Sequence, residues 1–258
     1  MKSLLQNRLR EELARWSDTG RVAEFWWRDD DVQAPTGALT KLLAISQRHH
    51  APLSLAAVPD GLKLSLPESL APYPTVNVLQ HGFSHNNYAP ADERKMELGW
   101  HRPEQVIRQQ LHSGVLALKG LFAESFVPML VPPWNRIDDQ VVALLPELGL
   151  MGLSTLGPRP ARQVVAGLTQ LNVHVDIINW REGRCFAGEA ACVEQILAHL
   201  QAKRSGDADS DEATGIMSHH LVHDQRCWEF LDVLFAFLVD SPDAKLVSAR
   251  DAITAATA

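Results

Sequence analysis

Several polar side chains of this chain could together hold a metal ion and perform hydrolysis. Asp29, Asp30 and Asp31 stand in a row, and His81 and His85 are four residues apart. Two histidines and one aspartate can bind Zn²⁺, or Fe²⁺, Mn²⁺ and Co²⁺ in similar geometry, and leave positions open for water and substrate. Such a metal would lower the pKa of a bound water and polarise a carbonyl group. A second aspartate could then take the water's proton, and a histidine opposite could protonate the leaving amine.

Spacing alone does not make either group a metal site. An aspartate run is usually a solvated turn, but this one follows the aromatic run FWWR, which is too apolar for an ordinary exposed turn. Carboxylates beside that run would be partly desolvated and would need a cation or a proton. His219 and His223 form a second pair with the spacing of His81 and His85. The apolar strand before His81, and Gly82 as a residue that permits a sharp turn, favour the first pair.

Three further polar clusters stand at or just after predicted strands. They are Pro132, Pro133 and Trp134; Asp176 and Trp180; and His219, His220 and His223. In parallel α/β folds the carboxyl ends of the strands meet at one edge, where the loops build an active site. The convergence of five clusters on strand ends is better evidence for an active site than any single cluster.

The pattern along the chain predicts short apolar strands that alternate with helices. An amphipathic helix opens the chain within residues 1–20, and Leu9, Leu13 and Trp16 share one of its faces. Strands are predicted at residues 23–28, 52–58, 75–80, 128–131, 151–156, 173–178, 215–218 and 245–248. Helices are predicted at residues 36–49, 103–121, 138–148, 190–203 and 225–239, with Pro103 in a first turn. Residues 204–213 are predicted to be a surface loop. We expect one α/β domain over residues 1–258, with a mostly parallel sheet that is open or closed into a barrel.

Composition and charge narrow the class of partner. The 258 residues are 46% hydrophobic and carry a net charge of −7, which argues against a nucleic-acid or anionic-membrane partner. Three cysteines without a CxxC motif fit a reducing compartment. The first residues lack the apolar core and cleavage site of a secretory signal, and no run approaches the length of a membrane span. We therefore expect a cytoplasmic protein, whose oligomeric state the sequence leaves open.

The order of the motifs resembles the polysaccharide deacetylase (NodB-like) family. RDDDV, HGFSH, VPPWN, DIINW and MSHH stand in the family's order, across residues 25–224. The resemblance implies a distorted (β/α) barrel of about seven strands. It implies Asp30 as general base and His219 as general acid, with Asp31, His81 and His85 as metal ligands. The resemblance further suggests that a backbone N–H near Trp134 stabilises the oxyanion, and that Pro133, Asp176 and Trp180 line the substrate site.

Two positions depart from the family's pattern. Val131 stands where the third motif usually opens with arginine, although Arg28 or Arg136 could reach the same carboxylate. Asn179 stands where an aspartate usually precedes the tryptophan of the fourth motif, which leaves Asp176 as the acid there. Both departures affect partners of the catalytic acid and base. The chain is thus identified as a divergent member.

The resulting hypothesis is a metal-dependent hydrolase that removes an acetyl or acyl group from an amide, in an N-acetyl sugar or a related small molecule. Zn²⁺ is the first expectation, with Fe²⁺, Mn²⁺, Co²⁺ or Ni²⁺ as alternatives. A catalytically inactive relative that binds a carbohydrate or metabolite, and a cyclic-amide or ureide hydrolase, are the alternative functions.

The three late histidines need separate roles. Strand alternation predicts that His219 points into the mouth of the barrel and His220 points the other way. The rival interpretation makes His219 and His223 a second pair of metal ligands.

Overall fold

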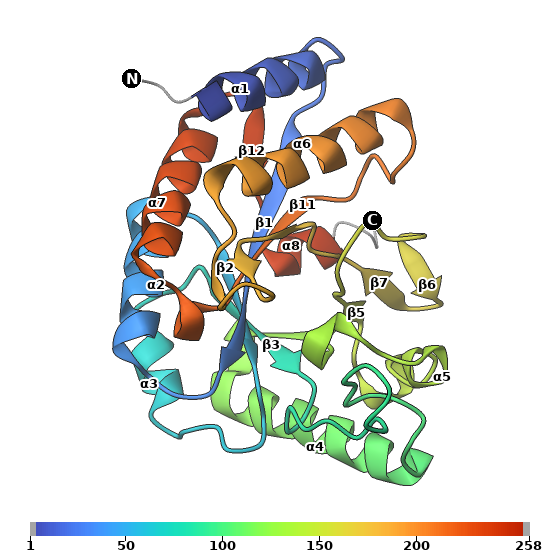
Figure 1. Ribbon diagram of the computed structural model, residues 1–258. Helices are drawn as coiled ribbons and strands as arrows, with labels where there is room; N and C mark the ends of the chain where they lie inside the picture. Colours follow the sequence, from blue (N-terminus) through green and yellow to red (C-terminus); the bar gives the residue numbers. More distant parts are fainter. Residues whose placement is uncertain (1–3, 255–258) are drawn as a thin grey trace.

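A mostly parallel sheet forms the centre of the molecule (Figure 1). The computed structural model describes residues 4–254. Its strands follow the order β6–β7–β5–β4–β3–β2–β1–β11–β8, and β12 also pairs with β1. The bounds are β1 (Ala23–Val32), β2 (Leu53–Ala57), β3 (Val76–His81), β4 (Phe126–Val131), β5 (Gly152–Leu153), β6 (Gln163–Val165), β7 (Leu168–Gln170), β8 (Val175–Asp176), β11 (Thr214–Ser218) and β12 (Ala244–Leu246). β9 (Ile178–Asn179) and β10 (Cys185–Phe186) pair separately.

The sheet curls into a distorted barrel whose ladder stays open. β7, the last parallel strand on one side, and β8 at the other end of the sheet are not bonded to each other. They are successive parts of one run of chain, in which Val173 N–H donates to Thr155 O on one side and His174 N–H donates to Gly215 O on the other. The backbone itself therefore bridges the gap that a further strand pairing would close. The expected α/β fold with a mostly parallel, barrel-like sheet is confirmed.

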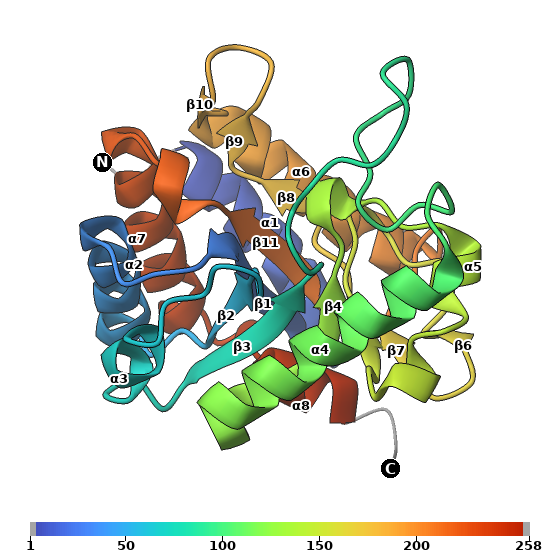
Figure 2. The same cartoon turned by 90° about the horizontal axis from the view of Figure 1, so that it is seen from below.

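Helices cover the outside of the sheet and match most of the predicted ranges. They are α1 (Leu4–Ser17), α2 (Gly37–Arg48), α3 (Leu66–Leu70), α4 (Glu104–Phe122), α5 (Asp139–Val142), α6 (Glu189–Ser205), α7 (Gln225–Asp240) and α8 (Ala249–Thr254). Of the predicted opening helix, residues 1–3 lie outside the described part. α1 lies along α6, α2 packs beside α7, and α4 crosses below β3 and β4 (Figures 1 and 2). Among residues 4–254, no helix has the length and apolar character that a membrane span needs.

Three local predictions were wrong, each for a backbone or packing reason. Residues 138–148 do not form one helix: α5 ends at Val142, and Pro146 opens a separate 3₁₀ turn, because proline cannot donate the next helical hydrogen bond. Pro103 precedes α4 as its N-cap residue and does not lie in the first turn. The loop after α6 is not wholly on the surface, since Glu212 is fully buried. The β6–β7 and β9–β10 pairs were not predicted, because strands of two or three residues carry too little periodicity.

Alternate residues of β1 face two different environments. Phe25 and Trp27 point outward into the core under the helices, where Trp27 packs against Phe235 of α7 with ring centroids 4.4 Å apart. Trp26 points into the barrel, and its indole N–H donates to Asn172 O at 2.8 Å. Both faces are apolar, which is why the strand reads as a continuous aromatic run.

Gly215 in β11 gives a test of the packing inside the barrel. A Cβ there would lie 2.4 Å from both Asn172 O and Trp26 Nε1. Because the first of these atoms belongs to the backbone, we expect Gly215→Ala to lower the free energy of unfolding by about 1–3 kcal/mol. Gly120→Ala is the matched control: its Cβ meets nothing within 4 Å, so helix propensity should stabilise by roughly 0.5–1 kcal/mol. Equal stability of the two variants in urea unfolding would contradict this packing.

Candidate metal centre and active site

Three consecutive aspartates at the end of β1 enter three different environments. Asp30 follows the inward alternation of Trp26 and Arg28 and is buried inside the barrel. Asp29 faces outward and is buried under the turn η4 (His220–Val222). Asp31 has a φ of 75°, and the pairing of β1 with β2 shifts register between Asp29 and Val32. This irregularity turns the Asp31 carboxylate towards the end of β3, as bulges beside active sites commonly do.

The predicted metal ligands lie together. Asp31 Oδ1 is 3.1 Å from His81 Nε2 and 3.3 Å from His85 Nε2. The three ligand atoms lie within 4.8 Å of one another. His81 is buried, whereas the side chains of His85 and Asp31 are 29% and 34% exposed. A closed inner side and an open outer side suit a metal that keeps positions free for substrate.

The hydrogen bond at the other ring nitrogen makes His81 a competent ligand. His81 Nδ1 lies 2.9 Å from Val131 O, which can only accept. Nδ1 therefore carries the proton, and the Nε2 lone pair faces Asp31 and His85. Val131, where an arginine was expected from the resemblance, thus contributes its backbone carbonyl.

Glu97 shapes the loop that carries His85, and the sequence analysis missed it. Its fully buried carboxylate accepts from the backbone N–H groups of Phe83 (3.2 Å), Ser84 (2.7 Å) and His85 (3.3 Å). Gly82, with a φ of 53°, leaves the space for it, because a Cβ there would lie 2.0 Å from Glu97 Oε2. Glu97 stands in a polar segment without a motif, so no sequence signal marks it. A buried carboxylate that collects three N–H groups fixes the course of the loop.

Arg28 is the buried partner of Asp30. Arg28 Nε lies 2.8 Å from Asp30 Oδ1, and Nη2 donates to Asp30 Oδ2 at 2.9 Å. The same guanidinium donates to Ser154 Oγ at 2.7 Å and to Asn135 Oδ1 at 2.7 Å. The sequence left open whether Arg28 or Arg136 would reach this carboxylate, and Arg28 is the one that contacts Asp30. Arg136 donates to Lys95 O in the loop after β3.

His219 is a second neighbour of the Asp30 carboxylate. His219 Nε2 is 3.8 Å from Asp30 Oδ2. The indole of Trp180 packs edge-on against the His219 ring, with centroids 4.7 Å apart, and its Nε1 donates to Asp176 Oδ2 at 2.8 Å. The structure therefore brings Asp176 and Trp180 together with the two predicted catalytic residues.

His220 and His223 have other partners. His220 Nδ1 lies 2.5 Å from Asp29 Oδ1, and both side chains are fully buried, so His220 points away from the mouth as strand alternation predicts. His223 Nε2 accepts from the backbone N–H of His219 at 3.3 Å, and its ring packs on Trp228. Within residues 4–254, the late histidines do not form a metal-ligand group with a third side chain.

The remaining predicted residues border the same mouth. Pro133 is buried, and Trp134, with a φ of 57°, packs edge-on against His85 at 4.6 Å between centroids. The Asn179 side chain bonds within its own loop and not to the other predicted site residues: its Oδ1 accepts from Arg181 N–H and Glu182 N–H before β10. The position that usually holds an acid therefore caps a turn here.

Burial and neighbouring charges set the ionisation of the mouth. Burial favours a higher pKa for Asp31, but the hydrogen bond and charge of His81, with His219 and His85, hold that pKa below its ordinary value. Burial and the charge of His81 lower the pKa of His85. Burial raises the pKa of Asp176 and lowers the pKa of His223 to about 4. An ionised Asp31 beside a neutral His85 is the protonation state that metal binding requires.

Comparisons with known proteins find the fold but no close relative. No protein-family model matches the chain, and no curated protein sequence matches it. A candidate polysaccharide deacetylase from Mycobacterium smegmatis is similar at a TM-score of 0.67 and 19% identity, over 92% of this chain and 90% of that one. A mutant of a CE4 family pseudoenzyme, with restored enzymatic activity, is similar at 0.60 and 13%, over 90% and 68%. The peptidoglycan deacetylase PdaC from Bacillus subtilis is similar at 0.56 and 12%, over 92% and 93%. These likenesses confirm the deacetylase fold that the motif order implied.

Glu97 offers a test of how the loop positions His85. In Glu97→Gln, the amide nitrogen would face N–H groups that need an acceptor, so the loop should lose its fixed course. We expect Zn²⁺ to bind about 10–100-fold more weakly, as for the loss of other groups that orient ligands. The measurement is competition with a chelator of known affinity. Glu93→Gln is the control, because that side chain lies 54% exposed in the same loop. Unchanged affinity in Glu97→Gln would show that the loop does not depend on this carboxylate.

Proposed function

We propose that this protein is a metal-dependent hydrolase that removes an acetyl or acyl group from an amide nitrogen. The observation that carries the proposal is the shared mouth, where a two-histidine, one-aspartate ligand set lies beside a buried Asp30 and His219. The fold adds support, because similar structures are named as deacetylases of polysaccharide or peptidoglycan. A small N-acetylated sugar or related amide is the proposed substrate, and a cytoplasmic location stays a prediction.

The donor set fits a divalent transition metal. His81 and His85 supply imidazole nitrogens and Asp31 supplies a carboxylate oxygen, which suits Zn²⁺ first and Fe²⁺, Mn²⁺, Co²⁺ or Ni²⁺ as alternatives. When bound there, the ion would supply Lewis acidity that acidifies water and polarises the amide carbonyl. Asp31 balances part of the positive charge, and the Val131 carbonyl keeps His81 in the ligating tautomer.

Asp30 and His219 divide the proton transfers. Asp30 acts as general base, since Arg28 keeps its carboxylate oriented inside the barrel. His219 donates a proton to the departing amine, and the edge of Trp180 holds its ring in place. His219 Nε2 lies 3.8 Å from Asp30 Oδ2. Asp30 can therefore accept a proton and His219 can donate one at the same bound amide.

The loops around the mouth bind the substrate. Trp180 is 43% exposed and presents an indole to which a sugar or ring face can stack. The turn at Pro133 and Trp134 presents backbone to the reacting carbonyl, where an N–H stabilises the oxyanion. Asp176 fixes Trp180 through its indole N–H.

The first test separates metal binding from proton transfer. Asp31→Ala, His81→Ala and His85→Ala should each lose metal, measured by metal analysis of the purified protein. Asp30→Asn should keep its metal and lose hydrolysis of an N-acetylated amine by roughly 10²–10⁴-fold, since it removes a base and not a ligand. Full metal content in all three ligand variants would overturn the assignment. An active Asp30→Asn enzyme would overturn the role of Asp30.

The second test compares the late histidines. His219→Ala should abolish turnover and retain metal, because its proton is delivered from outside the ligand set. His220→Ala should retain the catalytic groups and show its main effect on stability, since it leaves Asp29 buried without its imidazole partner, at a cost of about 3–5 kcal/mol. Two metal equivalents per chain, one lost in both His219→Ala and His223→Ala, would establish the rival metal pair.

An inactive binding relative predicts a different outcome. A relative of similar fold is named a pseudoenzyme, and Val131 and Asn179 depart from the family's pattern. The test is to load the wild-type protein with each candidate metal and to measure both binding of an acetylated sugar and release of acetate. Binding without release of acetate would show that the protein is a binding protein and not a hydrolase.

A further inference from the structure

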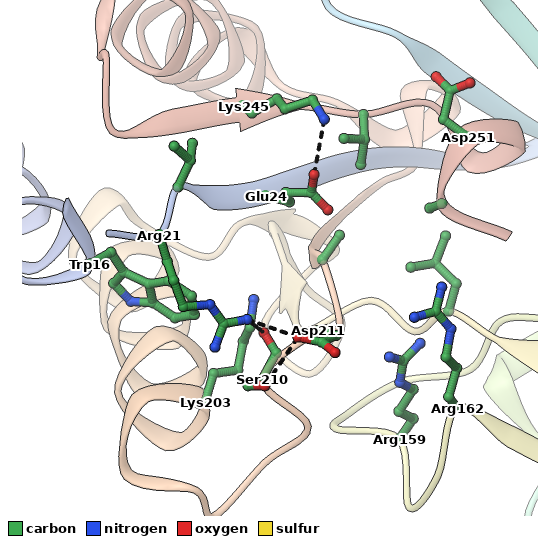
Figure 3. Close-up of a pocket in the computed structure, with 15 residues that line it drawn as sticks. Trp16, Arg21, Glu24, Arg159, Arg162, Lys203, Ser210, Asp211, Lys245 and Asp251 are labelled. Atoms are coloured by element: carbon green, nitrogen blue, oxygen red, sulfur yellow. Dashed lines mark hydrogen bonds and ion pairs between the residues drawn. The ribbon is translucent and has the colours of Figure 1, made fainter. Parts of the chain in front are cut away.

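A second cavity lies at the end of the barrel opposite the candidate active site. It has a volume of about 400 Å³ and is lined from α1, β1, the β5–β6 loop, α6, β12 and α8 (Figure 3). Glu24, near the start of β1, borders this cavity, and Asp30 lies six residues further along the same strand. Six residues of extended chain span about 20 Å. The cavity is therefore separate from the metal centre.

Five cationic side chains line this cavity, and three of them are already paired within the protein. Arg21 Nη2 lies 2.8 Å from Asp211 Oδ1, Lys245 Nζ lies 3.1 Å from Glu24 Oε1, and Arg159 Nη2 lies 2.8 Å from Asp209 Oδ2. In Figure 3, Arg21 and Lys203 approach the cavity from one side, and Arg159 and Arg162 from the other. The cavity is thus a convergence of cations from segments far apart in the sequence.

Lys203 and Arg162 are the two cationic residues of the cavity that are not in these ion pairs. Lys203 is 3% exposed, yet within residues 4–254 its ammonium makes no hydrogen bond or ion pair, and it lies over the face of Trp16, 4.7 Å from the ring centroid. The Arg162 guanidinium likewise has no partner in the described part of the chain, and its Nε is buried. A cationic donor without an acceptor is costly where water is scarce, so an anion in the cavity would supply the acceptor that Arg162 Nε and the Lys203 ammonium lack.

Glu212 does not meet this need. Glu212 is fully buried near Lys203, but both of its oxygens have other partners. Oε1 accepts from Asn172 N–H at 3.0 Å. Oε2 accepts from Arg159 N–H at 3.0 Å and lies 3.3 Å from His174 Nε2. Burial and the charges of Arg21 and Arg159 outweigh Glu212 and lower the pKa of Lys203 to about 8. The hydrogen bonds of Glu212 thus go to other donors, and Lys203 has no ion pair with it.

We propose that this cavity binds a small molecule through an oxyanion group, a phosphate or a carboxylate, held between Arg162 and Lys203. A guanidinium offers two parallel N–H donors to such a group, and the ammonium adds a compact charge. Val22, Leu171 and Val247 line the same cavity and would contact the less polar part of the ligand. Its volume suits a metabolite-sized molecule. The site is independent of the proposed hydrolysis.

The test is a titration of the full-length protein with inorganic phosphate and, in a separate arm, with succinate, followed by isothermal titration calorimetry. We expect saturable binding of at least one anion, and the arm that binds identifies the group. Arg162→Gln should weaken that binding about tenfold or more, because it removes charged hydrogen bonds. Since the Arg162 side chain has no bond to lose within the described residues, this variant should fold normally. Lys203→Met provides the second variant.

Two controls make the outcome decisive. Arg94→Gln removes an exposed arginine in the loop after β3 and should bind as the wild type does. His85→Ala removes a proposed metal ligand and should also leave anion binding intact. The proposal is wrong if neither anion binds saturably, or if Arg162→Gln binds as tightly as wild type. Loss of binding in His85→Ala with full binding in Arg162→Gln would assign the anion to the metal centre and equally overturn the proposal.

Discussion

The ion pair between Arg28 and Asp30 organises the interior of the barrel, and the candidate site is arranged around it. Arg28 is fully buried and Asp30 is 2% exposed, so neither charge has water to solvate it. Each charged group offsets part of the desolvation cost of the other. Removing one partner of such a buried pair typically lowers the free energy of unfolding by about 3–5 kcal/mol. The remaining donors of Arg28 bond Ser154 after β5 and Asn135 after β4. One guanidinium therefore ties the carboxyl end of β1 to the far side of the barrel, and Arg28 contacts Asp30 although Val131 stands where the resemblance implied an arginine.

A single irregularity at the end of β1 then gives neighbouring carboxylates different chemistry. Regular alternation would point Asp29 and Asp31 to the same face. The positive φ of Asp31 and the register shift beside it break that rule. Asp29 stays under the helices with His220, Asp30 stays with Arg28, and Asp31 reaches the histidine pair. Strained backbone of this kind persists only where surrounding contacts fix it, and positive φ values recur nearby at His85 and Trp134.

Hydrogen bonds at the second ring nitrogen distinguish a candidate metal ligand from a structural histidine. His81 and His174 both belong to groups of side chains close enough to share a metal. His81 Nδ1 faces the Val131 carbonyl and must donate, so Nε2 is free to coordinate. His174 Nδ1 instead accepts from Gly215 N–H at 2.9 Å, so its Nε2 carries the proton and points at Glu212. The second group, His174, His199 and Glu212, is thus a buried carboxylate–imidazole cluster that joins α6 to the loop before β11. Burial favours a higher pKa for Glu212, but the hydrogen bonds from His174 and His199 outweigh it and hold that pKa below its ordinary value.

The sequence by itself determined the alternation of the longer strands and helices, the α/β class and the residues that meet at the mouth. Continuous apolar runs identify buried parallel strands, and polar clusters directly after such runs must converge at one edge, which brought Asp31, His81 and His85 together with His219. Only the tertiary structure decided which arginine pairs with Asp30, that Glu97 holds the His85 loop, and that Lys203 and Arg162 share a cavity. Glu97 lies 12 residues from His85, and Lys203 lies 41 residues from Arg162, so these contacts join different segments. Arg28 and Asp30 are only two residues apart, but both must point into the barrel for the pair to form. The local periodicity of the sequence does not predict these contacts, because the partner of a buried charge depends on how the whole barrel packs.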